Sequence, residues 1–412
     1  MPSITSIVGR MCYNSRGQKA IEIDVITDQK YVGRACAPSG ASVGRYEAVS
    51  FPENRAENAL QVLNSNIKKF IGLDTFDTKV IYDKLQSIDD TGNYSRIGGS
   101  VAYALSIAAV DSAAKALGMP MFKVLKENGP YRFPIPLGNV LGGGAHAGPG
   151  TPDIQEFLVV PMGAKSITQA LEMNFEVHKE LKNVIEGKDK EFTYGRGDEG
   201  AWAPKMNNVQ ALDAVEKACS NCGFELGKDI AMGVDFATSS LWDQKSQSYV
   251  YARSGRKLTP ARQLEYISNI IKDYKLIYAE DPVHEGAFED MAELTKRFGN
   301  VYVTGDDLLV TNVGRLQEAI KHGACNAAIL KVNQAGSLHN AMDFAREANK
   351  NNIRLVTSHR SGESIDAHIA HIAIATNSKM IKAGVLGGER VAKLNELLRI
   401  SENNLTDGLA EV

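Results

Sequence analysis

The chain has 412 residues, of which 43% are hydrophobic and 23% are charged, and its formal net charge is −3. These values are typical of a globular protein of two or three domains and do not indicate a polyanion or a membrane as partner. The start, MPSITSIVGR, lacks the long apolar stretch of a secretory signal, and no apolar run approaches the roughly 20 residues that span a bilayer. We therefore expect a cytoplasmic protein that binds neither nucleic acid nor membrane.

The first third of the chain is rich in strands and then in helices. AIEIDVITD and YVGRACAP alternate as paired strands do, and residues 53–118 have helical periodicity, ending in the alanine-rich SVAYALSIAAVDSAAKALG. The segment KENGPYRFPIP, residues 126–136, concentrates proline and glycine. These patterns predict an N-terminal α+β capping domain over residues 1–130 and a second domain over residues 131–412.

Two spacings that resemble metal or redox motifs have plainer interpretations. Cys219 and Cys222 in CSNC lack a second CxxC pair, and the flanking ALDAVEKACSNCGFELG has a helical period with a glycine stop. His368 and His371 in AHIAH lack both an HExxH signature and a third ligand. We expect both pairs to lie on helices without a metal.

Beyond residue 136, short apolar runs end in ionisable residues and are followed by helical patterns. The runs IAMGVD, LIYAE, VYVTGD, AAILK, RLVTSH and KMIK end at Asp235, Glu280, Asp306, Lys331, His359 and Lys382. The steps between these ends are 45, 26, 25, 28 and 23 residues, and four of the five are one strand plus one helix long. This repeat predicts an α/β fold with a β/α barrel, whose site lies at the carboxyl ends of the strands.

Three of these strand ends are carboxylates, Asp235, Glu280 and Asp306. Mg²⁺ prefers such oxygen ligands, and a divalent cation would relieve their mutual repulsion. We expect nearby positive charge and burial to lower the pKa of a lysine among Lys331 and Lys382, so that one of them acts as a base. A base beside a metal-bound carboxylate substrate suits abstraction of a proton alpha to that carboxylate. The alternative is that the lysines only neutralise the acids.

The stretch GRGDEGAWAP sets Asp198 and Glu199 between glycines, just before Trp202. Partial desolvation near the tryptophan, together with the neighbouring carboxylate, should raise the pKa of Glu199 and make it a candidate general acid for expelling a hydroxyl. The same site could receive three further side chains: Gln155 and Glu156 of PDIQEFLVVP, and His146 of GGGAHAGPG.

The chain resembles the enolases, the phosphopyruvate hydratases, in the same order of motifs across nearly its whole length. The matching segments are APSGASVGRYEA, DIQEF, GDEG, AEDP, GDDLLVTN, LKVNQAGSL, SHRSGE and ERVAKLNELLRI. The resemblance implies a modified (β/α)8 TIM-like barrel preceded by a smaller α+β capping domain. It also implies a carbon–oxygen lyase of glycolysis and gluconeogenesis that dehydrates 2-phosphoglycerate to phosphoenolpyruvate, with two Mg²⁺ per active site. The oligomer it implies is a homodimer or a larger assembly of dimers.

The resemblance also implies roles for individual residues. Lys331 would take the C2 proton and Glu199 would help expel the C3 hydroxyl. Asp235, Glu280 and Asp306 would hold the first Mg²⁺, and Ser42 would close over the second. Substrate binding or proton relay would fall to the remaining set: His146, Gln155, Glu156, His359, Lys382, and Arg360 and Ser361 at the phosphate.

The chain departs from the usual enolase pattern near the expected site. It has Val43 in place of a hydroxyl, Ala201 in place of glycine, and Gly387 and Gly388 in place of Arg-Ser; Asn14, Gln18 and Lys19 also differ. These positions bear on loop closure, oligomer and substrate. Two alternatives therefore stand beside an enolase: a paralogue acting on another phosphorylated 2-substituted carboxylate, and a non-catalytic binding protein on the same fold.

Overall fold

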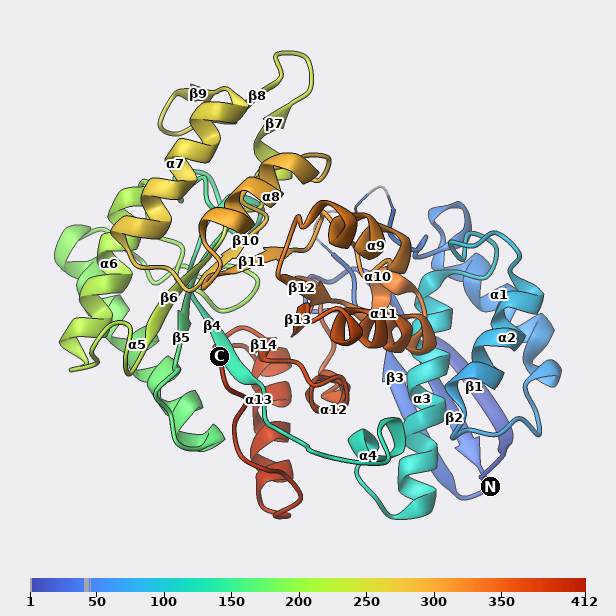
Figure 1. Cartoon of the computed structure of the whole chain (residues 1–412). Helices are drawn as coiled ribbons and strands as arrows, with labels where there is room; N and C mark the ends of the chain where they lie inside the picture. Colours follow the sequence, from blue (N-terminus) through green and yellow to red (C-terminus); the bar gives the residue numbers. More distant parts are fainter. Residues whose placement is uncertain (1, 41–43, 45) are drawn as a thin grey trace.

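The N-terminal part of the chain is a three-stranded antiparallel sheet covered by helices (Figure 1). The computed structural model describes residues 2–40, 44 and 46–412. The sheet has the order β1 (Ile4–Tyr13), β2 (Lys19–Thr27) and β3 (Tyr31–Cys36), so the two strands predicted from alternation are confirmed. The helices of this part are α1 (Ala56–Asn66), α2 (Thr78–Ile88), α3 (Gly99–Leu117) and α4 (Met121–Leu125).

Helix α3 is the core helix of this part. By length and composition alone it could cross a membrane, so the expectation that no apolar run approaches this length is wrong, but 78% of its apolar window is buried inside the protein. It packs directly on β3, because a Cβ added at Gly33 would lie 2.0 Å from the carbonyl oxygen of Ala108. Such a close approach requires small residues, which explains the alanine-rich sequence of α3.

The second part is a closed barrel of eight strands, which confirms the predicted barrel. Its strands are β4 (Ile135–Gly142), β5 (Glu156–Val160), β6 (Ala231–Asp235), β10 (Tyr278–Glu280), β11 (Tyr302–Gly305), β12 (Ala327–Leu330), β13 (Arg354–Ser358) and β14 (Met380–Lys382). Strand β5 runs antiparallel to both of its neighbours, and the other pairs are parallel. The barrel is therefore modified at one strand.

The helices of the second part lie around the barrel (Figure 1). They are α5 (Ile167–Lys188), α6 (Asn208–Asn221), α7 (Pro260–Asp273), α8 (Phe288–Arg297), α9 (Val313–His322), α10 (Val332–Ala335), α11 (Leu338–Lys350), α12 (His368–Ala375) and α13 (Gly388–Ser401). A small sheet of β7 (Trp242–Asp243), β8 (Ser248–Tyr251) and β9 (Arg256–Leu258) is inserted between β6 and α7. This insertion explains why the first of the predicted steps was longer than one strand and one helix.

The C-terminal tail pairs with the chain that leads into β4, although its sequence, SENNLTDGLAEV, is largely polar. The amide of Phe133 donates to the carbonyl of Gly408 at 2.8 Å, and the amide of Ala410 donates to the carbonyl of Phe133 at 2.8 Å. Leu409 and Val412 pack against the apolar residues inside the barrel. The backbone pairing and these two side chains hold a tail that composition alone marks as loose.

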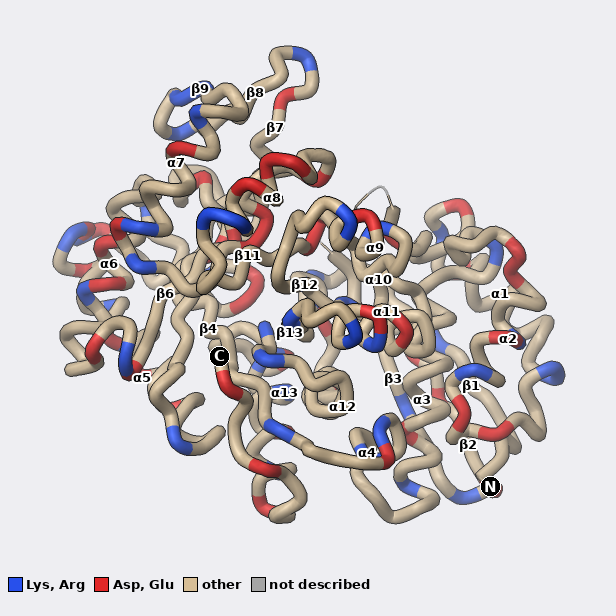
Figure 2. The backbone as a smooth tube through the Cα atoms, viewed as in Figure 1, with Lys and Arg blue, Asp and Glu red and all other residues tan. Residues whose placement is uncertain are grey.

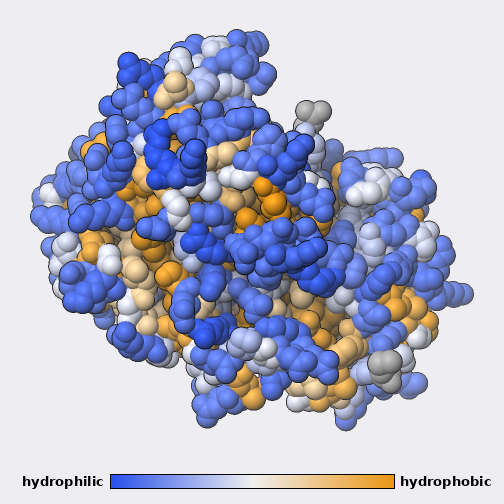
Figure 3. All heavy atoms as spheres, viewed as in Figure 1, coloured by the Kyte–Doolittle hydropathy of each residue, from blue (hydrophilic) through white to orange (hydrophobic). Residues whose placement is uncertain are grey.

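The surface carries charges of both signs over both parts of the chain (Figure 2). The face seen in Figure 3 is mostly hydrophilic, with apolar residues in small groups. This mixed surface agrees with the small net charge of −3.

Candidate active site

The ionisable strand ends found in the sequence meet at one end of the barrel. Asp235, Glu280 and Lys382 are the last residues of β6, β10 and β14. Asp306, Lys331 and His359 follow β11, β12 and β13 directly. Because these strands are parallel neighbours in a closed barrel, their carboxyl ends open on the same space.

Glu156 reaches the same place by the opposite route. It is the first residue of β5, and β5 is antiparallel, so the start of this strand lies beside the ends of its neighbours. In the strand register Glu156 faces Asp235, and Asp235 faces Glu280 on the other side. The reversed strand thus adds a fourth carboxylate to the row.

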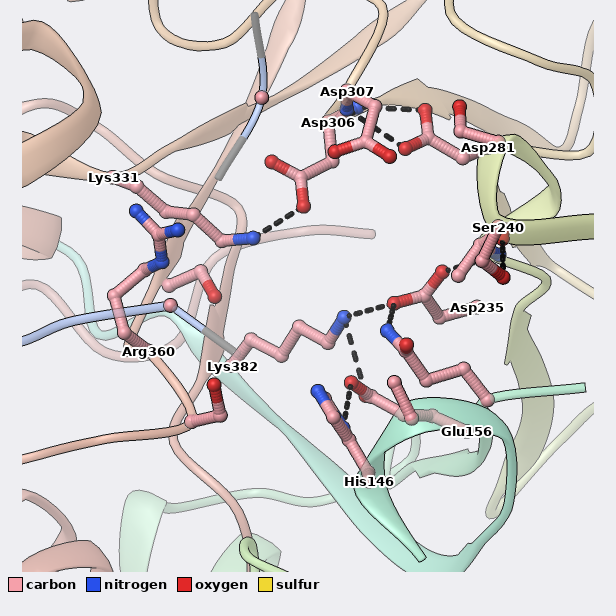
Figure 4. Close-up of a pocket in the computed structure, with 18 of the residues that line it drawn as sticks. His146, Glu156, Asp235, Ser240, Asp281, Asp306, Asp307, Lys331, Arg360 and Lys382 are labelled. Atoms are coloured by element: carbon pink, nitrogen blue, oxygen red, sulfur yellow. Dashed lines mark hydrogen bonds and ion pairs between the residues drawn. The ribbon is translucent and has the colours of Figure 1, made fainter. Parts of the chain in front are cut away.

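A cavity of about 460 Å³ opens at this end of the barrel (Figure 4). The predicted residues that line it are His146, Gln155, Glu156, Glu199, Asp235, Asp306, Lys331, His359, Arg360, Ser361 and Lys382. Glu280 lies just behind this lining, fully buried, with its Oε2 at 2.7 Å from the Nζ of Lys382. Ser42 and Val43 lie outside the described residues. Several lining residues had no predicted role, among them Glu47, Ser239, Asp281, Asp307 and Gln334.

The two lysines of the cavity are bound by carboxylates. The Nζ of Lys382 lies 2.9 Å from Asp235, 2.7 Å from Glu280 and 3.1 Å from Glu156, and Lys331 pairs with Asp306. Burial lowers the pKa of each lysine, but the facing carboxylates outweigh burial, so both pKa values are raised. The prediction of a lowered lysine pKa is therefore wrong, because it ignored how closely the acids approach the amines.

The acidic side of the cavity fits a divalent cation. The three predicted ligands do not form one group. Lys382 lies between Asp235 and Glu280 and pairs with both. Asp306 instead lies with Asp281 and Asp307, and these three residues each offer an oxygen within 4.8 Å of the other two. Among the described residues no hydrogen-bond partner reaches the buried Oε1 of Glu280. Burial, and then Asp235, raise the pKa of Glu280 well above its usual range. A divalent cation would coordinate this unpartnered oxygen and offset the repulsion among the neighbouring carboxylates.

Glu199 lines the cavity among histidines. Its Oε1 is 3.1 Å from Nε2 of His359 and 3.6 Å from Nδ1 of His146, and Nδ2 of Asn139 donates to its Oε2 at 3.0 Å. Burial raises the pKa of Glu199, but His359 and His146 outweigh it, and the pKa lies well below the usual range. The predicted raised pKa is wrong, and Asp198 instead pairs with Arg16 at 3.4 Å.

Arg390, a buried residue of the ERVAKLNELLRI segment for which no role was predicted, fixes the orientation of His359. Its Nη1 lies 2.9 Å from Nδ1 of His359, and it donates to the carbonyls of Arg360 at 2.6 Å and Ser361 at 2.7 Å. A guanidinium can only donate, so Nδ1 accepts and the ring proton lies on Nε2, facing Glu199. Burial lowers the pKa of His359 to about 4, so the ring is neutral near pH 7.

Arg360 lines the cavity and pairs with Glu47, to which the sequence had assigned no role. Its Nη1 is 3.0 Å from Oε2 of Glu47 and donates to Oδ1 of Asn333 at 3.0 Å. Glu47 lies in APSGASVGRYEA, one of the segments that resemble the enolases, and this resemblance could have indicated its place in the site. The guanidinium is therefore fixed at the wall of the cavity before any ligand arrives.

Trp202 supports the loop that carries Glu199 rather than packing on the carboxylate. Its Nε1 donates to the carbonyl of His178 at 2.8 Å, its ring stacks on His178 at 4.7 Å, and Nε2 of His178 lies 2.9 Å from the carbonyl of Gly200. The left-handed conformation in this loop falls on Gly200, with φ of +81°, and not on Ala201. Ala201 is therefore accommodated without backbone strain.

We expect Gly200→Ala to lower both stability and turnover. A Cβ at this position would lie 2.1 Å from the carbonyl oxygen of Leu386, and the left-handed φ adds about 1–3 kcal/mol of strain. Thermal unfolding should show a melting temperature lowered by several degrees.

The matched control for this substitution is Gly195→Ala in the same loop. Gly195 is exposed and has nothing within 4 Å of an added Cβ, so this variant should behave as the parent. Equal melting temperatures for the two variants would contradict the assigned role of Gly200.

Comparison with known proteins places both parts of the chain in one family. The family model described as "Enolase, C-terminal TIM barrel domain" matches residues 130–410, and "Enolase, N-terminal domain" matches residues 4–125. A protein named enolase from Methanosphaera stadtmanae is 44% identical over 405 residues, 98% of each chain. An enolase from Methanothermobacter thermautotrophicus is 43% identical over 395 residues, 95% of each chain. An enolase from Halorubrum lacusprofundi is 40% identical over 407 residues, 98% of this chain and 100% of the relative.

Proposed function

The chain belongs to the enolase family, and we propose that it dehydrates 2-phosphoglycerate to phosphoenolpyruvate with a division of labour among the residues of its cavity. The observation that supports this division is a single cavity lined both by lysine–carboxylate pairs and by a Glu199–His359 pair. Ala201, Gly387 and Gly388 do not line the cavity, so nothing among its described walls favours another substrate.

Asp235, Glu280 and Asp306 would hold the first Mg²⁺, and Ser42 would contribute to the second, giving two per active site. When bound, Mg²⁺ supplies positive charge that offsets the carboxylates and stabilises negative charge developing on the substrate carboxylate. The buried, unpartnered oxygen of Glu280 supports this assignment. The assignment also requires Asp235 and Glu280 to turn from Lys382 towards Asp306, which in this structure lies in a close acidic group with Asp281 and Asp307.

Lys331 would take the C2 proton. Its Nζ points into the cavity from the end of β12 (Figure 4), and it must be neutral to accept a proton. Its ion pair with Asp306 holds it charged, so this pair must loosen before the proton moves. Lys382 is held by three carboxylates and suits a fixed positive charge beside the substrate better than a base.

Glu199 and His359 would act together at the C3 hydroxyl. Glu199 is ionised at rest, so it must first take up a proton from solvent, which it then delivers to the hydroxyl as that group leaves as water. Neutral His359, whose Nε2 lies 3.1 Å from Glu199, would hold the carboxyl in position. The C3–O bond breaks as the double bond between C2 and C3 forms. His146, Gln155 and Glu156 would position the substrate beside this pair, and Arg360 and Ser361 would bind its phosphate.

Removal of divalent cations should abolish turnover and lower stability. We expect absorbance at the ultraviolet band of phosphoenolpyruvate to rise with 2-phosphoglycerate and Mg²⁺, and to stay flat after chelation. Mg²⁺ at 100 times its dissociation constant should stabilise the folded protein by about 2.7 kcal/mol, measured as a raised melting temperature. Turnover that survives chelation would overturn the metal assignment. A flat trace in both conditions would favour the paralogue, and other phosphorylated hydroxy acids would then be assayed.

The wider organisation follows from the same family membership. We propose a boundary at residues 130 and 131, supported by the change from the antiparallel sheet and its helices to the first barrel strand, β4. We also propose a cytoplasmic enzyme that assembles as a homodimer or a larger assembly of dimers, which sedimentation of the purified protein would test.

A further inference from the structure

Two cysteines far apart in the sequence meet in the N-terminal sheet. The Sγ atoms of Cys12, near the end of β1, and Cys36, the last residue of β3, are 3.1 Å apart. Cys36 is buried and Cys12 is partly exposed, and neither forms a disulfide. An oxidant in solution can therefore reach the Cys12 thiol, and the Cys36 thiol lies buried next to it.

We propose that Cys12 and Cys36 form a reversible disulfide that couples the oxidation state of the protein to the wall of the active site. The bond requires the sulfurs to approach by about 1 Å, to an S–S distance of about 2.05 Å. Because β2 lies between β1 and β3, it also requires the ends of these two strands to bend towards each other across β2. With hydrogen peroxide as oxidant, the Cys12 thiolate attacks one peroxide oxygen and becomes a sulfenic acid, while the other oxygen leaves as hydroxide and takes up the proton that the thiol had released, giving water. The Cys36 thiol then attacks the sulfenic sulfur and releases a second water, so one peroxide and two thiols give one disulfide and two waters.

The environment assigns different roles to the two thiols. The contact between the two sulfurs lowers the pKa of Cys12, and the same contact together with deeper burial raises the pKa of Cys36. The partly exposed sulfur is thus the one favoured as thiolate, which is the form that reacts with peroxide. Cys12 is the attacking thiol and Cys36 the resolving thiol.

The strand ends that carry these cysteines are joined to the active-site wall. Asn14, two residues after Cys12, donates to Oγ of Ser39 at 2.8 Å. Ser39, three residues after Cys36, exchanges backbone hydrogen bonds with Gly362 at 2.8 and 2.9 Å. Gly362 follows Ser361, which lines the cavity, as do Gly40 and Gly44 farther along from Cys36. Drawing the two strand ends together therefore displaces segments that form the cavity.

The CxxC pair, which sequence spacing would favour for redox chemistry, is unsuited to it. Cys219 is buried on α6, and Cys222 caps the end of that helix. Burial raises the pKa of Cys219 to about 12 and that of Cys222 to about 11, so both stay protonated near pH 7. This pair provides an internal control.

The test is peptide mapping of the reduced full-length protein after treatment with an equimolar amount of hydrogen peroxide. We expect an intact mass lower by two hydrogens, a linked peptide containing Cys12 and Cys36, and a several-fold fall in kcat that dithiothreitol reverses. The Cys219→Ser, Cys222→Ser double variant should respond as the parent does. Linkage through Cys219 or Cys222, linkage between chains, or no linkage would overturn the proposal. A disulfide that leaves kcat unchanged would overturn the coupling to the cavity.

Single variants separate the two roles. Cys36→Ala should stop at a sulfenic acid on Cys12, trapped by dimedone, whereas Cys12→Ser should give neither the trapped adduct nor the disulfide. A dimedone adduct on Cys36 in Cys12→Ser would contradict the assigned order of attack.

Discussion

Lys331→Ala is expected to reduce the turnover of 2-phosphoglycerate by about 10³–10⁴-fold, because it removes the base that accepts the C2 proton. The side chain lies at the end of β12 and its loss leaves the carboxylates of the cavity in place. Binding of Mg²⁺, measured by calorimetry, should therefore persist. Exchange of the C2 proton with deuterated solvent, followed by NMR, should disappear together with dehydration.

The matched control is Lys321→Ala, an exposed lysine in the last turn of α9. It removes the same side chain outside the cavity and should leave turnover unchanged. Proton exchange that continued in Lys331→Ala would show that another group is the base, and Lys382 would be the next candidate.

Glu199→Gln is expected to separate the two halves of the reaction. The amide keeps the shape of the side chain but cannot deliver a proton, so dehydration should fall by about 10²–10⁴-fold. Lys331 is untouched, so exchange of the C2 proton with solvent should continue. The two readings are phosphoenolpyruvate absorbance and NMR of the C2 position in deuterated water.

Asp198→Asn is the control for this variant. It neutralises the adjacent carboxylate, whose side chain pairs with Arg16 and does not line the cavity. Most of the activity should remain. If Glu199→Gln also lost proton exchange, the assignment of separate groups to the two steps would be wrong.

Local sequence was sufficient to predict most of the barrel and its strand ends. Apolar runs that end at Asp235, Glu280 or Lys382 reveal their strands because burial on both faces requires an unbroken apolar run. The spacing of these ends follows from the length of one strand and one helix. Motif resemblance then gave the family, which the family models confirm.

Site chemistry was less predictable, since it depends on distances between residues far apart in the chain. The pKa of Lys331 is raised because Asp306, 25 residues away, reaches its amine. The pKa of Glu199 is lowered because His359 and His146 face it against the effect of burial. The directions predicted from the sequence for both pKa shifts were wrong, because neighbours along the chain, such as Asp198, are not the neighbours in space.

The sequence by itself determined the family, the two-part organisation of strands and helices, and the residue types that meet at the barrel mouth. Only the tertiary structure decided that β5 runs antiparallel and brings Glu156 beside Asp235, that Arg390 sets the tautomer of His359, and that Cys36 meets Cys12. The physical reason is that periodicity records which side of each element is buried, whereas electrostatics and thiol chemistry depend on atoms that the fold alone brings within a few ångströms of one another.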